Sequence, residues 1–143
     1  AMVPAAETRA AVASRATARS RAAGKPATES AAATSKASAE AAASQPGFTP
    51  SARRGATLFQ QRFAVNDKMP ACTTCHTDTP LQSGQHAITG KAIRPLAVAA
   101  NGERFNDPLK VDKWFGRNCK EVVGRACSAA EKADFVAYMS EVR

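Results

Sequence analysis

The pattern of apolar and polar positions divides the chain into two parts. Residues 1–49 consist mainly of Ala, Ser and Thr with scattered Arg and Lys, and they contain few large apolar side chains. Such a segment buries too little apolar surface to offset the conformational entropy that is lost on ordering. We therefore predict a flexible basic N-terminal arm over residues 1–49, with fluctuating helix around 31–43, and a folded domain over 50–143. The arm is interpreted as a linker, with a partner-seeking tether as the alternative.

In the second part, two helices are predicted near the ends of the domain. Ser51 is a suitable N-cap for a helix that runs to about residue 65. Ser128 and Glu131 have the spacing of a capping box, which predicts a last helix running to about residue 142. We expect the two helices to cross, because each has an apolar face and the first carries a small residue beside its aromatic ones. The positions expected at the crossing are Gly55, Phe59, Phe135 and Tyr138.

A further helix is predicted between these two. Asp107 is a suitable N-cap, and Pro108 occupies the first helical position, where its missing N–H is not needed. Gly116 is expected to end this helix, because glycine often follows the last helical residue. Residues 117–119 are then predicted to form a bend. Together these elements predict an all-α fold of about four helices.

The charge adds a preference for partners. The formal net charge is +8, which favours acidic proteins or an anionic membrane surface. Nucleic acid is not expected, because the charge is scattered and Tyr and Trp occur once each. No stretch of the sequence approaches the about 20 consecutive apolar residues that a transmembrane helix needs. A hydrophobic signal core is also lacking, so any export signal is expected to have been removed already.

The sequence Cys72-Thr73-Thr74-Cys75-His76 is the motif C-x-x-C-H, the attachment signature of a c-type haem. Two thiols at this spacing bind the vinyl groups of one porphyrin, and His76 then becomes the proximal iron ligand. A redox C-x-x-C motif would be surrounded by a βαβ pattern, and a zinc site would have a second pair of Cys or His. The sequence has neither. We therefore predict one covalent haem c, held by Cys72, Cys75 and His76, inside an all-α fold like that of class I cytochromes c.

Taken alone, these residues leave the second iron ligand open. His86 lies in a polar loop ten residues after His76, and Met139 lies on the apolar face of the last helix. Either would give a six-coordinate iron, although a loop histidine is usually solvated and a methionine on such a face usually fills a core. Met69 directly precedes the motif and has little chain length to reach the opposite side of a haem.

Other haem contacts are expected from two segments. Lys91 and Arg94 are candidates for pairing with the haem propionates, with solvated surface cations as the alternative. The apolar run that follows is suited to the proximal side, where a backbone carbonyl would accept the Nδ1 proton of His76. The expected haem contacts outside the C-x-x-C-H motif are Lys91, Arg94, Pro95, Leu96, Trp114 and Phe115.

The two remaining cysteines are Cys119 and Cys127. Haem attachment of this kind occurs in an oxidising compartment, so a disulfide is the default for this pair.

Five motifs occur in order in the second part of the chain. They are C-T-T-C-H, T-G-K-x-I-x-P-L-A, R-F-x-D, K-V-x-K-W-F-G-R-N-C and V-x-G-R-x-C-x-x-x-E-K-A-D. This pattern, over roughly residues 50–143, resembles the family of the sphaeroides haem protein and of cytochrome c″ of methylotrophs. The resemblance implies that Asn118 is the distal iron ligand, as in the Asn-ligated branch, and that Cys119 and Cys127 form a disulfide. Val98, where relatives often have Pro, and His86 depart from the family pattern.

The resemblance also implies a function. We expect a periplasmic or otherwise exported monohaem cytochrome that transfers electrons to or from a dihaem cytochrome c and a membrane b-type cytochrome. An amide is a weak neutral ligand that ferric iron tolerates better than ferrous iron, so Asn118 is expected to leave on reduction and to open the site to O₂, NO or CO. The alternatives are a plain electron carrier with His86 or Met139 on the iron, and a peroxidase-like or NO-handling enzyme. An enzyme is not favoured, because the sequence places no distal acid–base pair.

Overall fold

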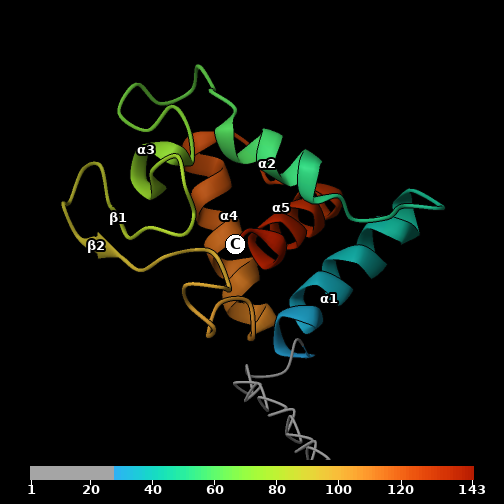
Figure 1. Cartoon of the computed structure of the whole chain (residues 1–143). Helices are drawn as coiled ribbons and strands as arrows, with labels where there is room; N and C mark the ends of the chain where they lie inside the picture. Colours follow the sequence, from blue (N-terminus) through green and yellow to red (C-terminus); the bar gives the residue numbers. More distant parts are fainter. Residues whose placement is uncertain (1–27) are drawn as a thin grey trace, which may run out of the picture.

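The computed structural model describes residues 28–143, and predictions that concern residues 1–27 lie outside this part. The described chain forms five helices and one small antiparallel sheet (Figure 1). In chain order the elements are α1 (Thr28–Ser44), α2 (Ala52–Gln60), α3 (Thr73–His76), β1 (Gly84–Gln85), β2 (Ala92–Ile93), α4 (Pro108–Val122) and α5 (Ala129–Glu141). The predicted all-α class is confirmed, although the short hairpin of β1 and β2 was not predicted. None of the helices between residues 28 and 143 is long and apolar enough to cross a bilayer.

Helices α2 and α5 cross at very short distance, as predicted (Figure 1). A Cβ atom on Gly55 would lie 2.0 Å from the carbonyl oxygen of Asp134 and 2.9 Å from the Cβ atom of Tyr138. The ring of Phe59 is fully buried, and its centroid lies 6.2 Å from that of Phe135 and 6.0 Å from that of Tyr138. The small residue thus lets the backbones touch, and the aromatic rings fill the space one turn further along.

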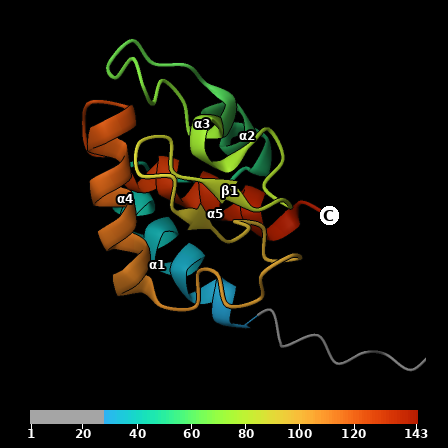
Figure 2. The same cartoon turned by 90° about the vertical axis from the view of Figure 1, so that its left-hand side faces the viewer.

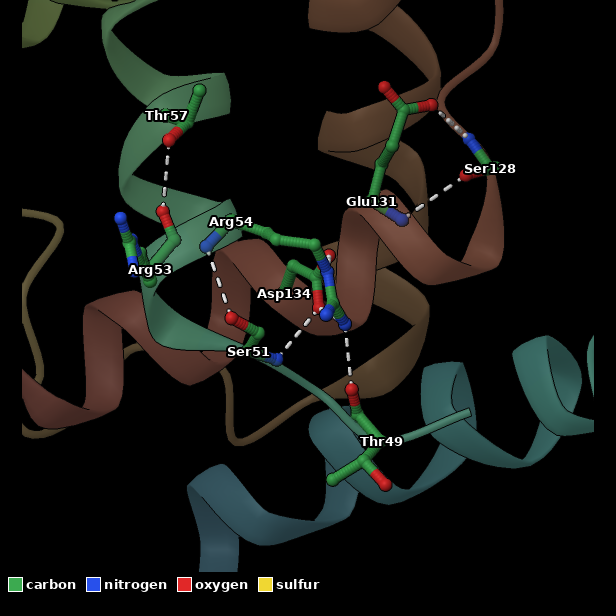
Figure 3. Close-up of polar contacts among 8 residues, drawn as sticks. All are labelled: Thr49, Ser51, Arg53, Arg54, Thr57, Ser128, Glu131 and Asp134. Atoms are coloured by element: carbon green, nitrogen blue, oxygen red, sulfur yellow. Dashed lines mark hydrogen bonds and ion pairs between the residues drawn. The ribbon is translucent and has the colours of Figure 1, made fainter. Parts of the chain in front are cut away.

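A buried carboxylate fixes the start of α2 on α5 (Figure 3). Asp134 is only 6% exposed and accepts hydrogen bonds from Arg54 Nε at 2.8 Å and Arg54 Nη2 at 2.9 Å. The backbone N–H of Ser51 donates to the same carboxylate at 2.8 Å. Arg54 Nη2 also donates to the carbonyl of Thr49 at 2.7 Å. Because these groups satisfy the buried charge, α2 is held in one orientation on α5.

The core around this crossing is mostly aromatic. The side chains of Phe59, Leu96, Phe135 and Met139 form a buried cluster. Partly buried side chains complete it, and one of them belongs to the C-x-x-C-H motif. These additional members are Cys72, Phe105, Phe115 and Tyr138. The cluster therefore joins α2, α4 and α5 to the attachment motif.

Helix α1 lies along α5 and touches α4 (Figure 2). Its contact side consists of small residues, and Ala33, Ala37 and Ala41 are buried at one-turn intervals. Helix was predicted around residues 31–43, but as a fluctuating structure in a flexible arm, whereas residues 28–44 form one packed helix. The difference arises because alanine both favours helix and allows close approach, so that few large side chains are needed. A domain boundary at residue 50 stays a prediction.

The starts of the helices agree with prediction better than their ends. Ser51, Asp107 and Ser128 all cap helices through their side chains, and Ser128 forms the predicted capping box. Helix α2 ends at Gln60, short of the predicted residue 65, where the chain turns extended and Phe63 N–H donates to the carbonyl of Pro70 at 2.7 Å.

The predicted end of α4 at Gly116 is wrong, and so is the predicted bend over residues 117–119. The helix continues to Val122, and Gly116 lies in its interior. The residue that ends it is Gly124, which has φ +82° and donates its N–H to the carbonyl of Cys119 at 3.0 Å. A glycine in the left-handed region is the usual stop signal, and of Gly116 and Gly124 only Gly124 adopts it.

Candidate haem-binding site

Helix α3 is a single turn formed by the C-x-x-C-H motif itself. The N–H of His76 donates to the carbonyl of Cys72 at 3.1 Å, which closes the turn. Residues three and four apart lie on the same side of a helix, so the side chains of Cys72, Cys75 and His76 share one side of α3. This arrangement fits a covalent haem, which needs two thiols and one imidazole directed at the same group.

The chain leaves the motif in a strained conformation. Thr77 directly follows His76 and has φ 62° and ψ 174°, a region that is essentially restricted to glycine. Its hydroxyl donates to the carbonyl of Thr79 at 3.0 Å, which helps to hold this geometry. A β-branched residue at such an angle costs of order 1–3 kcal/mol, so the surrounding structure must hold the end of α3 firmly.

The hairpin of β1 and β2 covers one side of the motif (Figures 1 and 2). A Cβ atom on Gly84 would lie 2.0 Å from the carbonyl oxygen of Cys75 and 3.0 Å from the Cα atom of His76. The N–H of Ala87 lies 3.3 Å from the sulfur of Cys75. The hairpin therefore contacts the backbone of α3 directly, and only a residue without a side chain fits at position 84.

A cavity of about 410 Å³ lies between α3 and this hairpin. Cys75 borders it on one side and His86 on the other. Nδ1 of His86 accepts hydrogen bonds from the N–H groups of Ile88 at 3.2 Å and Thr89 at 3.1 Å. The imidazole thus caps the turn of the hairpin, and Nε2 is the nitrogen that remains for another partner.

The two other motif side chains have shifted pKa values. Burial raises the pKa of the Cys72 thiol to about 11, and this side chain packs against the buried cluster. Burial, together with the nearby cation of Arg104, lowers the pKa of His76 to about 4. His76 is therefore a neutral imidazole at neutral pH, which is the form that binds iron.

Arg104 is a functional candidate that the sequence reasoning missed. Its Nε donates to the carbonyl of Pro95 at 2.9 Å and its Nη2 to the carbonyl of Arg94 at 2.7 Å. Asn101 Nδ2 also reaches the Pro95 carbonyl, at 3.4 Å. These bonds hold the segment around Pro95 next to the motif. The motif R-F-x-D contains Arg104, but nothing in its spacing indicates this role.

The residues expected to contact haem after the hairpin differ in exposure. Leu96 is buried in the core cluster beside Cys72, and Pro95 is half-buried. Lys91 is exposed, and Arg94 is exposed and lies 3.4 Å from Glu103 in an ion pair. Leu96 is thus placed in the core that contains Cys72, whereas the two cations lie at the surface.

The two expected residues of α4, Trp114 and Phe115, differ in their surroundings. The ring of Phe115 meets Phe135 edge-on, with centroids 5.2 Å apart. Trp114 is half exposed, and the cations of Lys113 and Arg117 lie 5.9 Å and 6.0 Å from its ring centroid. Asn118 follows Phe115 by three residues and Trp114 by four, so it neighbours both along α4, and it is exposed.

The residue after Asn118 is fixed by a covalent bond. Cys119 and Cys127 are joined, with an S–S distance of 2.00 Å and a sequence separation of 8. Cys72 and Cys75 are therefore the cysteines that remain for haem attachment. Met139, one of the alternative ligands, is fully buried within the core cluster.

Comparison with known proteins agrees with this geometry. Residues 45–139 match the family model described as "Domain of unknown function (DUF1924)". Cytochrome c-type protein SHP of Cereibacter sphaeroides is 43% identical over 95 residues, which are 66% of this chain and 73% of that protein. The chain belongs to the SHP family of c-type cytochromes. The resemblance of its five motifs to this family is thereby confirmed.

Solved structures of the SHP family have the same fold. The structure of oxidized SHP, described as an oxygen binding cytochrome c, is 39% identical and has a TM-score of 0.70, with 78% of this chain and 95% of that chain covered. The solution structure of cytochrome c″ from Methylophilus methylotrophus, described in terms of haem-ligand detachment, is 35% identical with a TM-score of 0.67. The match covers 80% of this chain and 94% of the cytochrome c″ chain. The cytochrome fold predicted from the motifs is confirmed.

Proposed function

We propose that this chain is an exported monohaem c-type cytochrome that transfers electrons and binds a small diatomic gas, O₂, NO or CO, in its reduced state. The observation that carries the proposal is the one-turn helix α3, which brings together two free thiols and a neutral imidazole within one turn. A haem bound there would supply an iron atom that takes up and gives off one electron and can bind a small ligand.

The residues of α3 have distinct roles in this proposal. Cys72 and Cys75 form the thioether bonds, and His76 binds the iron through a nitrogen that is neutral because of burial. A carbonyl of the 94–96 segment orients the imidazole by accepting its Nδ1 proton. Arg104 supports this segment through its bonds to the carbonyls of Arg94 and Pro95.

Asn118 is proposed as the distal ligand. It lies on the side of α4 that also carries Phe115, whose ring meets the core, and the disulfide at Cys119 fixes its backbone. Its amide is neutral and a weak donor, so it binds ferric iron better than ferrous iron and leaves on reduction. Oxygen binding by SHP and ligand detachment in cytochrome c″ support this cycle by analogy.

The alternative ligands have other functions in the fold. Met139 is fully buried among the aromatic side chains of the core. Nδ1 of His86 accepts two backbone hydrogen bonds in the hairpin turn. The packing of Met139 favours Asn118, since Met139 would have to leave the core to reach the iron. The hairpin bonds of His86 use only its Nδ1, so His86 stays the alternative ligand through Nε2.

The proposed partners follow from charge and from the family resemblance. A net charge of +8 favours acidic electron-transfer proteins, and the proposed ones are a dihaem cytochrome c and a membrane b-type cytochrome. Lys91 and Arg94, both exposed, are proposed to meet the haem propionates at the edge of the site. Covalent attachment through thioethers and a disulfide both point to an exported protein in an oxidising compartment.

Spectra of the holoprotein in both oxidation states test this function. Asn118→Ala is expected to change the coordination of the ferric iron, and the reduced wild-type protein is expected to bind CO rapidly and completely. Asn106→Ala removes the same side chain at an exposed position and serves as the control. Unchanged ferric coordination in Asn118→Ala would exclude Asn118 as ligand. A ferrous wild-type protein that does not respond to CO would refute gas binding.

A further inference from the structure

A carboxylate on α4 is bound by lysines from two other helices. Lys36 of α1 donates a hydrogen bond to Oδ2 of Asp112, and Lys132 of α5 lies 3.5 Å from Oδ1. Lys36 also pairs with Glu40 within α1 at 3.6 Å. Lys36, Asp112 and Lys132 are called the Asp112 cluster below. This cluster ties α1, α4 and α5 together through one side chain.

The packing around the Asp112 cluster leaves almost no space. The cavity at this junction is about 10 Å³ and is bordered by Ala37 of α1, Val111 of α4 and Val136 of α5. A single water molecule needs at least this much room. The first half of α4 therefore moves away from α1 and α5 only if the ion pairs of the Asp112 cluster break.

Helix α4 connects the Asp112 cluster to the proposed distal ligand. Asp112 and Asn118 are six residues apart on a continuous helix, which is a rise of about 9 Å. The chain beyond Asn118 is fixed at Cys119 by the disulfide. Between these points α4 meets α5 through the edge-on contact of Phe115 with Phe135. The tilt of α4, and with it the direction of Asn118, is thus set by the ion pairs of the Asp112 cluster, the contact of Phe115 with α5 and the disulfide at Cys119.

We infer that the Asp112 cluster positions Asn118 and sets how readily its amide leaves the iron. The inference rests on the proposed function, in which Asn118 is the distal ligand. Asp112, Lys36 and Lys132 are positioning residues, because they act through the tilt of α4 and do not touch the iron. Helix α1, which carries no residue of the haem site, thereby has a role in ligand exchange.

The direction of the effect follows from the preference of the amide for ferric iron. With the Asp112 cluster intact, Asn118 is held in place and stabilises the oxidised state. When the cluster is broken, α4 tilts more easily and Asn118 detaches sooner, so the reduction potential rises and CO binds sooner after reduction. High salt should have a similar effect on the wild-type protein, because the pairs are partly exposed and are screened.

The test compares variants of the full-length holoprotein by potentiometric titration and by the rate of CO binding when the ferric protein is rapidly reduced in the presence of CO. Asp112→Asn is expected to raise the potential and to speed CO binding several-fold, with a rate that no longer depends on salt. Asp112→Glu should restore wild-type behaviour in part. Glu40→Gln keeps the Asp112 cluster and removes only a pair within α1, so it should behave like the wild-type protein.

Measurements on the Asn118→Ala variant separate this inference from the proposed function on which it rests. If Asn118→Ala leaves ferric coordination unchanged, the proposed function fails. If Asn118→Ala changes coordination but Asp112→Asn leaves both potential and rate at wild-type values, only the inference is overturned. The same holds if Asp112→Asn has an equal effect in the Asn118→Ala background. Should Asp112→Asn yield no folded holoprotein, Lys36→Gln, which keeps the Lys132 pair, must show the same change at smaller size.

Discussion

Gly55 and the carbonyl group of Asp134 are in direct contact where α2 crosses α5. A Cβ atom at position 55 would lie 2.0 Å from that oxygen, a distance that side chains do not adopt. The obstacle is a backbone atom in the middle of a helix, so it does not move aside as the end of a flexible side chain would. The same turn of α5 presents the Asp134 carboxylate to Arg54, which locks the crossing in register.

We predict that Gly55→Ala destabilises the holoprotein by about 1–3 kcal/mol, because the two helices must separate to admit one methyl group. Urea unfolding monitored by circular dichroism measures the change. Gly116→Ala is the matched control: it lies inside α4 with nothing within 4 Å of the added atom. There alanine should stabilise by about 0.5–1 kcal/mol through helix propensity. Equal effects at the two positions would contradict this account.

Gly84→Ala is expected to reduce haem attachment. The added methyl group would lie 2.0 Å from the carbonyl oxygen of Cys75, so either the hairpin or the turn of α3 has to move. We expect the fraction of purified chain that carries covalent haem, measured as the ratio of haem to protein absorbance, to fall several-fold. Gly102→Ala, at an open position, should have the wild-type ratio. Full loading of Gly84→Ala would show that the contact is not needed.

Removal of the disulfide is expected to cost about 2.5 kcal/mol of stability, the value that the loop-entropy model gives for a loop of this length. The double variant Cys119→Ala, Cys127→Ala should therefore unfold at lower urea concentration than the wild-type protein. Reduction of the wild-type disulfide should produce a similar shift. A double variant as stable as the oxidised wild-type protein would rule out a stabilising role.

The capping box of α5 predicts a dependence of stability on pH. Glu131 accepts bonds from Arg125 at 2.7 Å and 3.0 Å and from the N–H of Ser128 at 2.9 Å. The pair with Arg125 holds the pKa of Glu131 below its ordinary value of 4.5. A lowered pKa means that the folded protein releases this proton more readily than the unfolded chain does. The stability gained is therefore complete above about pH 4.5 and is lost as the pH falls through the lower value.

Comparison of the wild-type protein with Glu131→Gln measures this contribution. The wild-type protein should be more stable at pH 7, and the difference in urea midpoint should shrink as the solution is acidified below about pH 4. Glu141→Gln, an exposed change at the end of the same helix, is the control. A difference that stays constant down to pH 3 would mean that the carboxylate charge of Glu131 does not stabilise the fold.

Helix starts could be predicted from the sequence because capping is local. The side chains of Ser51, Asp107 and Ser128 each bond to N–H groups two or three residues away, so the signal and its effect lie in the same turn. Helix ends were less predictable. Gly116 and Gly124 are chemically identical, and only the surrounding backbone decides that Gly124 adopts positive φ.

The attachment motif was equally local, but its supporting residues were not. C-x-x-C-H closes on itself as one helical turn, so Cys72, Cys75 and His76 could be named from spacing alone. Arg104 acts through carbonyls of residues nine and ten positions earlier, which depends on how the loop folds back. The packing of α1 was missed for a similar reason. A row of alanines shows no periodic contrast with its neighbours, and only the partner helix reveals which side is buried.

The position of Cys72 has a consequence for how the protein matures. Its partly buried side chain packs against the cluster that contains Phe59 and Phe135. An enzyme that attaches haem to the polypeptide needs access to the Cys72 sulfur, and the packed helices of the folded protein would restrict that access. If haem is joined to Cys72 as proposed, thioether formation is therefore expected on a chain that is still open, and the aromatic core is expected to close over the linkage afterwards.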